Sequence, residues 1–173
     1  MEHHNNAGSD EASRQGCKNT FALLAILLFV MAFRIAVMER IIVNGNSMYP
    51  TLASSDVCMV LKLNISPQRY DIAIARVGGQ TIIKRVIGLP GETLQIIDGK
   101  VYIDGQAVSE EYDFFTEEPG LLENPYTVGA NEYFLMGDNR AGSYDSRNFG
   151  SVGIKNIKGI VLCRIYPFWY SSP

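Results

Sequence analysis

Beyond residue 40, the apolar residues of this chain come in short runs, separated by glycine, proline and other turn residues. No amphipathic helical pattern of any length occurs there. Short runs rich in valine and isoleucine are typical of β-strands, and Asp98-Gly99 joins two of them in the manner of a hairpin turn. The predicted strands cover residues 41–43, 57–63, 71–77, 81–89, 93–98, 100–105, 132–138 and 157–168. We therefore expect a mainly β domain over residues 41–173, with antiparallel barrel-like or folded sheets.

The N-terminal segment has a different character. Residues 1–20 are polar and predict a flexible tail, and Phe21–Phe33 is an uncharged apolar run that continues past Arg34 to Met38. Such a run fits a membrane-spanning helix, the core of a secretory signal or a buried helix. It has no convincing small-residue cleavage site after it and no polar face. We therefore expect one N-terminal transmembrane helix, a retained anchor over residues 21–40.

Composition excludes several classes of function. The net charge of −3 makes the chain a poor nucleic-acid binder, so no nucleic-acid partner is expected. Its two histidines are His3 and His4, which excludes a Ser-His-Asp triad or a histidine-ligated metal from the folded body. Cys17, Cys58 and Cys163 are too widely spaced for a CxxC motif, and whether Cys58 and Cys163 form a disulfide is left open. No metal and no cofactor are expected.

One stretch of the predicted domain is strongly acidic. Residues 101–139 contain no lysine or arginine. Within it, residues 104–123 carry seven acidic side chains, which are Asp104, Glu110, Glu111, Asp113, Glu117, Glu118 and Glu123. We expect residues of about 104–131, named the acidic segment below, to be a solvated loop insertion.

Three local sequences carry residues suited to nucleophilic catalysis. Ser47 lies in a polar, glycine-containing turn, where a serine alone is more typical of turn chemistry. Lys84 shares a strand face with Ile82 and Val86. If that face points inward, burial lowers the pKa of the amine, which can then accept a serine proton; if it points outward, Lys84 is an ordinary surface lysine. The run Gly137–Arg147 predicts either a loop held by Asp–Arg ion pairs or an exposed polar turn.

Together, and in this order, the three sequences resemble the conserved boxes of type I signal peptidases, the membrane-bound serine proteases that remove signal peptides from exported proteins. The box G-x-S-M-x-P-T-L is matched by Gly45–Leu52, and K-R-V-I-G-x-P-G-[DE] is similar to Lys84–Glu92. The box G-D-N-R-x-x-S-x-D-S-R is matched at every fixed position by Gly137–Arg147. The resemblance covers about residues 20–167.

The resemblance implies a serine-type endopeptidase with a Ser/Lys dyad that works through an acyl-enzyme. Ser47 would be the nucleophile, Lys84 the general base, and Ser143 the residue that orients the lysine by a hydrogen bond. The oxyanion hole would use the N–H of Ser47. Many members of the family use a serine hydroxyl at the position of Gly45 as a second donor. The Gram-positive-like members often lack that serine, as this chain does. Glycine has no side chain, so the second oxyanion donor is unassigned.

The same resemblance implies supporting roles in the last box. Asp145 and Arg147 would pair to brace the loop, and Asp138 and Arg140 would support the site from outside it.

The resemblance also implies topology and partners. Residues 1–20 would be cytoplasmic, and residues 41–173 an extracytoplasmic catalytic domain on the cell (cytoplasmic) membrane, held by a single pass. The partners would be the lipid bilayer and the signal peptides of exported pre-proteins, cut after small-x-small sites. Two alternatives stay open: a specialised Ser/Lys peptidase of conjugation or pilin type, and a non-catalytic, membrane-anchored β binding module. The aromatic residues at 166–170 fit either an interfacial patch or core packing.

Overall fold

The computed structural model describes residues 19–32, 37–62, 66–108 and 115–167. The chain divides into two compact units, Met1–Met38 and Glu39–Pro173. In the first unit a helix covers residues 19–32, and its side chains are exposed. Of the helices within the described ranges, none is both long and apolar enough to cross a membrane.

The end of the predicted anchor differs from expectation. Strand β1 covers Met38–Ile42, so residues 38–40 belong to a sheet and not to a helix. The physical reason is pairing, because β1 lies beside β2 and the ladder between strands overrides the weak helical preference of so short a stretch. The described residues therefore do not support a transmembrane helix over residues 21–40.

The predicted strands are all present, with ends that move by a few residues. They are β1, β2 (Val57–Leu61), β3 (Ile72–Val77), β4 (Gln80–Gly88), β5 (Thr93–Ile97), β6 (Lys100–Ile103), β9 (Glu132–Met136) and β11 (Ile157–Tyr166). The elements that the sequence pattern missed are β7 (Gln106–Ala107), β8 (Tyr126–Thr127), β10 (Val152–Gly153), α2 (Ser146–Phe149) and the 3-10 helices η1 (Gly120–Glu123) and η2 (Ile154–Asn156). Elements this short have too few residues to show a period.

The strands form two antiparallel sheets. The larger has the order β1-β2-β11-β3-β4-β9-β10, and the smaller has the order β7-β6-β5-β8. The larger sheet ends at β1 and β10 and does not close, so the barrel-like expectation is wrong while the expectation of folded antiparallel sheets is confirmed. Register shifts in β11 and β4 bend the sheet without bringing its two edges together.

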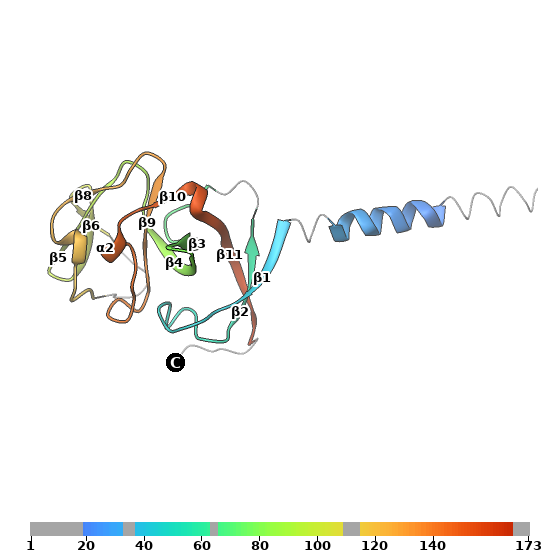
Figure 1. The fold of residues 1–173 in the computed structure, drawn as a ribbon, viewed down its shortest axis with the longest axis horizontal. Coiled ribbons are helices and arrows are strands. Elements are labelled where there is room, and N and C mark those ends of the chain that lie inside the picture. The colour runs from blue at the N-terminus through green and yellow to red at the C-terminus, as the bar shows by residue number, and fades with distance from the viewer. Residues whose placement is uncertain (1–18, 33–36, 63–65, 109–114, 168–173) are drawn as a thin grey trace, which may run out of the picture. The chain divides into compact units, whose positions relative to one another are not determined.

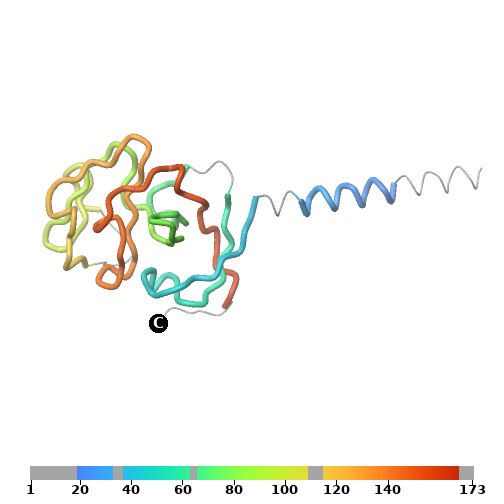
Figure 2. Tube along the Cα trace, viewed as in Figure 1, coloured from blue at the N-terminus to red at the C-terminus, as the bar shows by residue number. Residues whose placement is uncertain are grey.

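Strand β4 lies at the centre of the unit that begins at Glu39. In Figures 1 and 2 the small sheet lies at one end, β1, β2 and β11 lie at the other, and the green β4 lies between them. Successive side chains of a strand point to opposite faces. Ile87 therefore packs in one core cluster with Leu94, and Val86 packs in the other with Leu135. A strand covered on both faces gives its side chains fixed positions.

The acidic segment is partly ordered and contributes to the core. Its described residues include β7, η1 and β8, and Leu122 and Val128 pack in the core cluster of the small sheet. Its described acidic side chains remain exposed, and these are Asp104, Glu117, Glu118 and Glu123. The segment differs from the solvated loop that we expected because two apolar residues, spaced among the charges, tie it to the sheet.

The structure describes two of the three cysteines and the first part of the C-terminal aromatic run. Cys58 is buried and Cys163 exposed, and both are free thiols, so the pairing left open by the sequence is not made. Cys17 lies outside the described residues. Tyr166 is exposed, while residues 168–170 of the aromatic run lie outside the described part of the chain.

Candidate active site

Ser47 lies in a tight turn whose two ends are fixed. Gly45 has φ +88°, a left-handed conformation that glycine adopts without strain. Just beyond the serine, Met48 and Leu52 are buried in a small core cluster, and the Leu52 N–H donates to the Met48 carbonyl at 2.8 Å. From across the domain, the Asn139 N–H donates to the Ser47 carbonyl at 3.0 Å. The turn therefore presents the serine hydroxyl from a rigid base.

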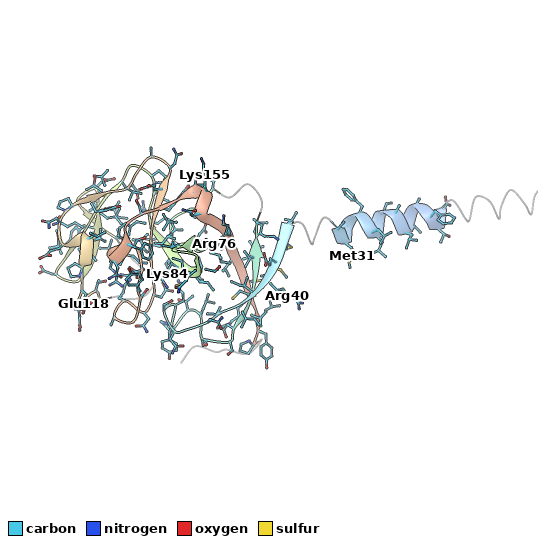
Figure 3. All side chains as sticks on the ribbon, viewed as in Figure 1. Met31, Arg40, Arg76, Lys84, Glu118 and Lys155 are labelled. Atoms are coloured by element: carbon cyan, nitrogen blue, oxygen red, sulfur yellow. The ribbon has the colours of Figure 1, made fainter. Side chains whose placement is uncertain are left out.

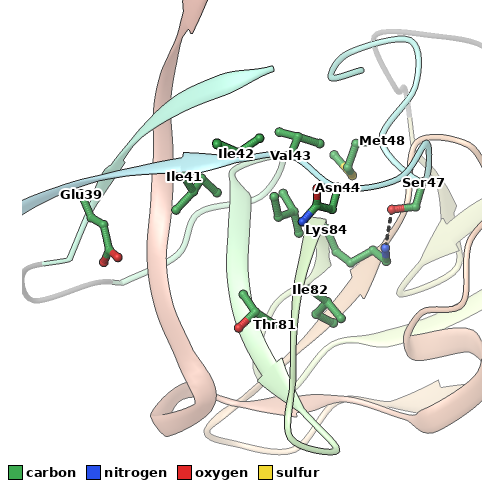
Figure 4. Close-up of a pocket in the computed structure, with 11 residues that line it drawn as sticks. Glu39, Ile41, Ile42, Val43, Asn44, Ser47, Met48, Thr81, Ile82 and Lys84 are labelled. Atoms are coloured by element: carbon green, nitrogen blue, oxygen red, sulfur yellow. Dashed lines mark hydrogen bonds between the residues drawn. The ribbon is translucent and has the colours of Figure 1, made fainter. Parts of the chain in front are cut away.

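Lys84 comes to this hydroxyl from the centre of β4. It is 5% exposed, and Figure 3 shows it in the body of the domain, whereas Lys155 is exposed at the surface. Its Nζ donates a hydrogen bond of 2.6 Å to Ser47 Oγ, drawn as a dashed line in Figure 4. The structure thus brings together the serine and the lysine that the sequence singled out, 37 positions apart.

The surroundings of Lys84 favour its neutral form. Burial is the largest effect and lowers the pKa of the amine below its ordinary value of 10.5. The negative charges of Asp145 and Asp138 act in the opposite direction, and the positive charge of Arg147 lowers the pKa further. A neutral amine can accept the proton of the serine hydroxyl to which it is already hydrogen bonded.

A groove of about 460 Å³ opens beside this pair. One wall comes from β1 and the residues that follow it, including Ile41 and Val43, and the other from β4, including Thr81 and Ile83. Figure 4 shows Ser47 and Lys84 at one end of the groove and Glu39 at the other. The lining combines branched apolar side chains with polar ones, which suits an extended peptide that presents both side chains and backbone groups.

Asp145 is the organising carboxylate of the Gly137–Arg147 loop. It is fully buried and forms a two-pronged ion pair with Arg147, with both N···O distances 2.9 Å. Its side chain also caps α2 and accepts the Gly137 N–H at 2.9 Å. The Asp145 carboxylate therefore fixes the start of α2, the side chain of Arg147 and the backbone at Gly137.

Asp138 pairs with an arginine that the sequence reasoning had not chosen. Arg85 Nε and Nη2 donate to its two carboxylate oxygens at 2.7 and 2.6 Å, and Arg85 Nη2 also donates to Thr51 Oγ1 at 3.1 Å. The only sequence signal was a charged residue alternating with Ile83 and Ile87 on one strand face. Arg140 instead donates to the Gly137 carbonyl at 3.1 Å, inside its own loop.

Ser143 lies beside the dyad but does not make the predicted bond. Its Oγ is buried and has no hydrogen-bond partner within the described residues, so the expected hydrogen bond to Lys84 is not present. A Cβ placed on Gly137 would lie 2.2 Å from Ser143 Oγ and 2.5 Å from the Ser47 carbonyl oxygen. Ser143 and the Ser47 carbonyl therefore both pack closely against Gly137, which has no side chain to keep them apart.

The Ser47 N–H donates to no backbone acceptor in the described part of the chain, so it is available to a bound anion. Gly45 offers no side-chain donor, and a Cβ added there would meet nothing within 4 Å. The predicted second oxyanion donor remains unassigned.

This chain is similar to known proteins over most of its length. The family model described as signal peptidase, peptidase S26, matches residues 17–166. The signal peptidase I of Leptolyngbya laminosa is 34% identical over 172 residues, covering 92% of this chain and 82% of that protein. Signal peptidase I S of Bacillus subtilis strain 168 is 34% identical over 164 residues, covering 85% and 87%. A crystal structure titled as a signal peptidase I from Enterococcus faecalis V583 is 33% identical, with a TM-score of 0.46, and covers 56% of this chain and 97% of that one.

The family match extends over most of the chain, and the residues that it covers include Ser47 and Lys84. The chain belongs to the signal peptidase family, peptidase S26, and is a serine-type endopeptidase.

Proposed function

We propose that this protein removes signal peptides from exported pre-proteins with Ser47 as nucleophile and Lys84 as general base. The observation that carries the proposal is the 2.6 Å hydrogen bond between Lys84 Nζ and Ser47 Oγ on a buried lysine. Family membership supports the substrate class, because the relatives are named signal peptidases.

The substrate binds as an added strand along the groove. β1 is an edge strand of the large sheet, and β9 pairs with β4 only from Arg85 onward. The backbone of β4 before that point is therefore paired with β3 alone. An extended peptide gains main-chain hydrogen bonds at such an edge. The branched side chains that line the groove leave room for small residues, which fits cleavage after small-x-small sites.

The chemistry follows from the two side chains. Neutral Lys84 takes the hydroxyl proton as Ser47 Oγ attacks the scissile carbonyl, and the Ser47 N–H donates to the developing oxyanion. The protonated lysine then gives its proton to the leaving amine, which leaves the acyl group on Ser47. Lys84 next takes a proton from water, whose oxygen attacks the ester. As the ester bond breaks, Lys84 returns that proton to Ser47 Oγ, which frees the serine hydroxyl and releases the cleaved signal peptide.

The N-terminal apolar segment anchors the enzyme by a single pass, with the unit from Glu39 onward outside the cytoplasm. The uncharged apolar sequence Phe21–Phe33 supports this proposal. An anchor there holds the site near the membrane from which signal peptides emerge.

The test is cleavage of a purified pre-protein that carries an Ala-x-Ala site, with the cut mapped by mass spectrometry. Full-length protein will cut once after the second alanine. Ser47→Ala and Lys84→Ala will each lower the rate by several orders of magnitude, while Lys155→Ala, which alters an exposed lysine, will keep it. Appreciable cleavage by either dyad variant would refute the mechanism, and an uncut pre-protein would refute the function.

A further inference from the structure

The acidic segment contacts the Gly137–Arg147 loop at two arginines. Arg140 Nη1 donates to Thr116 Oγ1 at 3.1 Å, and Arg147 Nη1 donates to the Glu118 carbonyl at 3.2 Å. A Cβ on Gly120 would lie 2.5 Å from the Arg147 carbonyl oxygen, so the two backbones are in close contact there. These contacts join the acidic segment to the Gly137–Arg147 loop, which contains Asp145.

Thr116 is held firmly on its own side. It is 2% exposed, and its N–H donates to the Gly99 carbonyl at 2.9 Å. Gly99 lies in the β5–β6 turn with φ +75°, next to the Asp98 that the turn dipeptide predicted. The backbone of Thr116 is therefore fixed to the β5–β6 turn of the small sheet.

A short chain of contacts leads from Thr116 to the reacting atoms. Arg140, held by Thr116, donates from Nε to the Gly137 carbonyl at 3.1 Å. Gly137 in turn lies against both Ser143 Oγ and the Ser47 carbonyl oxygen. Two residues on, the Asn139 N–H donates to that same Ser47 carbonyl. A shift of the Gly137 backbone therefore moves the support of the nucleophile directly.

We propose that Thr116 is a positioning residue for cleavage: its hydroxyl fixes Arg140, and through Gly137 it holds the loop that closes one side of the Ser47–Lys84 pair. The inference rests on the proposed function and assigns the small sheet a part in catalysis. Thr116 touches neither substrate nor dyad, so its effect passes through Arg140 and the loop.

Loosening the loop has a defined effect on Lys84. The charged groups that act on the amine are Asp145, Asp138 and Arg147. All three lie in the Gly137–Arg147 loop. Burial is the dominant influence on its pKa. Water admitted by a displaced loop therefore stabilises the ammonium form and raises the pKa, so that the acidic limb of the rate profile moves to higher pH.

The experiment compares three variants of the full-length protein with wild type. Thr116→Val keeps the shape and removes the hydroxyl, and Thr116→Ser keeps the hydroxyl. Thr127→Val is the matched control, since it removes an exposed hydroxyl of the small sheet whose hydrogen-bond partner among the described residues is Thr93 Oγ1, at 3.1 Å. We expect Thr116→Val to lower kcat by about tenfold to a hundredfold, the cost of misplacing a reacting group, with KM unchanged and the acidic limb shifted to higher pH. Thr116→Ser and Thr127→Val should behave as wild type.

Wild-type kcat and an unshifted limb in Thr116→Val would overturn the inference, as would equal losses in Thr116→Val and Thr127→Val. A second readout does not depend on cleavage: the pKa of Lys84, from the pH dependence of its reductive methylation measured by mass spectrometry. If wild type cuts no pre-protein but Thr116→Val raises that pKa, the proposed function fails and the positioning role stands. If Thr116→Val does not fold, Thr116→Ala, with circular dichroism to verify folding, is measured for the same pKa. An unchanged value there overturns the proposal.

Discussion

At residue 84, an amine lies at 5% exposure on a strand that is covered on both faces. Lysines are rarely buried to this extent, because removing an ammonium group from water is costly. The residue is thus a poor choice for stability and a suitable one for proton transfer. Ser143 is also a poor choice for stability, because its buried hydroxyl has no hydrogen-bond partner within the described residues.

The first prediction is that Lys84→Met stabilises the fold at neutral pH while it abolishes activity. The pKa of Lys84 is lower in the folded chain than its ordinary value of 10.5, so between those two values the unfolded chain binds more protons. Wild-type stability therefore rises with pH through that window. Urea denaturation should show a gain of about 1–2 kcal/mol for the variant at pH 7, shrinking as pH approaches 10.5. A variant less stable than wild type at pH 7 would contradict the burial argument.

At the scale of the element, the Gly137–Arg147 loop depends on close backbone contacts. Asp145 fixes the start of α2 and pairs with Arg147, and Arg85 holds Asp138 from β4. The loop can be this compact only because Gly137 has no Cβ to separate it from Ser47.

The second prediction concerns Gly137→Ala. Its methyl group would overlap Ser143 and the Ser47 carbonyl, so we expect destabilisation of about 1–3 kcal/mol and a fall in kcat of about a hundredfold from the displaced serine. The matched control is Gly153→Ala, because a Cβ there meets nothing within 4 Å and its φ of −63° suits alanine. Thermal denaturation and pre-protein cleavage measure the two effects. Equal activity of the two variants would show that the contact is dispensable.

The elements also show how far the sequence could be read. Strand periodicity is local, so each long strand, β4 with Lys84 included, was predictable from its own residues. The approach of Lys84 to Ser47 followed from the resemblance and not from the pattern. The pairing of Arg85 with Asp138 and of Arg140 with Thr116 was missed, because contacts 53 and 24 positions apart depend on how separate elements pack.

At the scale of the whole molecule, we propose that the unit beginning at Glu39 carries catalysis and that the apolar segment before it attaches the enzyme to the membrane. Every residue that lines the groove belongs to the second unit. The role of the segment before Glu39 can therefore be tested by truncation without removing any residue of the groove.

The third prediction is that a chain beginning at Glu39 loses membrane attachment. Full-length protein should float with vesicles of phosphatidylglycerol and phosphatidylethanolamine in a density gradient, because Phe21–Phe33 is apolar enough to partition into lipid. The truncated chain should remain mainly at the bottom, and circular dichroism should show that its β content is kept. Equal flotation of the two chains would move the attachment to the second unit.

The most direct test of the central claim is to trap the acyl group on the enzyme. Full-length protein is mixed with a pre-protein peptide, quenched in acid at successive times and mapped by tandem mass spectrometry over a series of pH values. The account predicts an adduct on Ser47 alone, formed faster as pH rises through a Lys84 pKa below 10.5, and lost in Lys84→Met. An adduct on another residue, or a rate on Ser47 that Lys84→Met leaves unchanged, would contradict it.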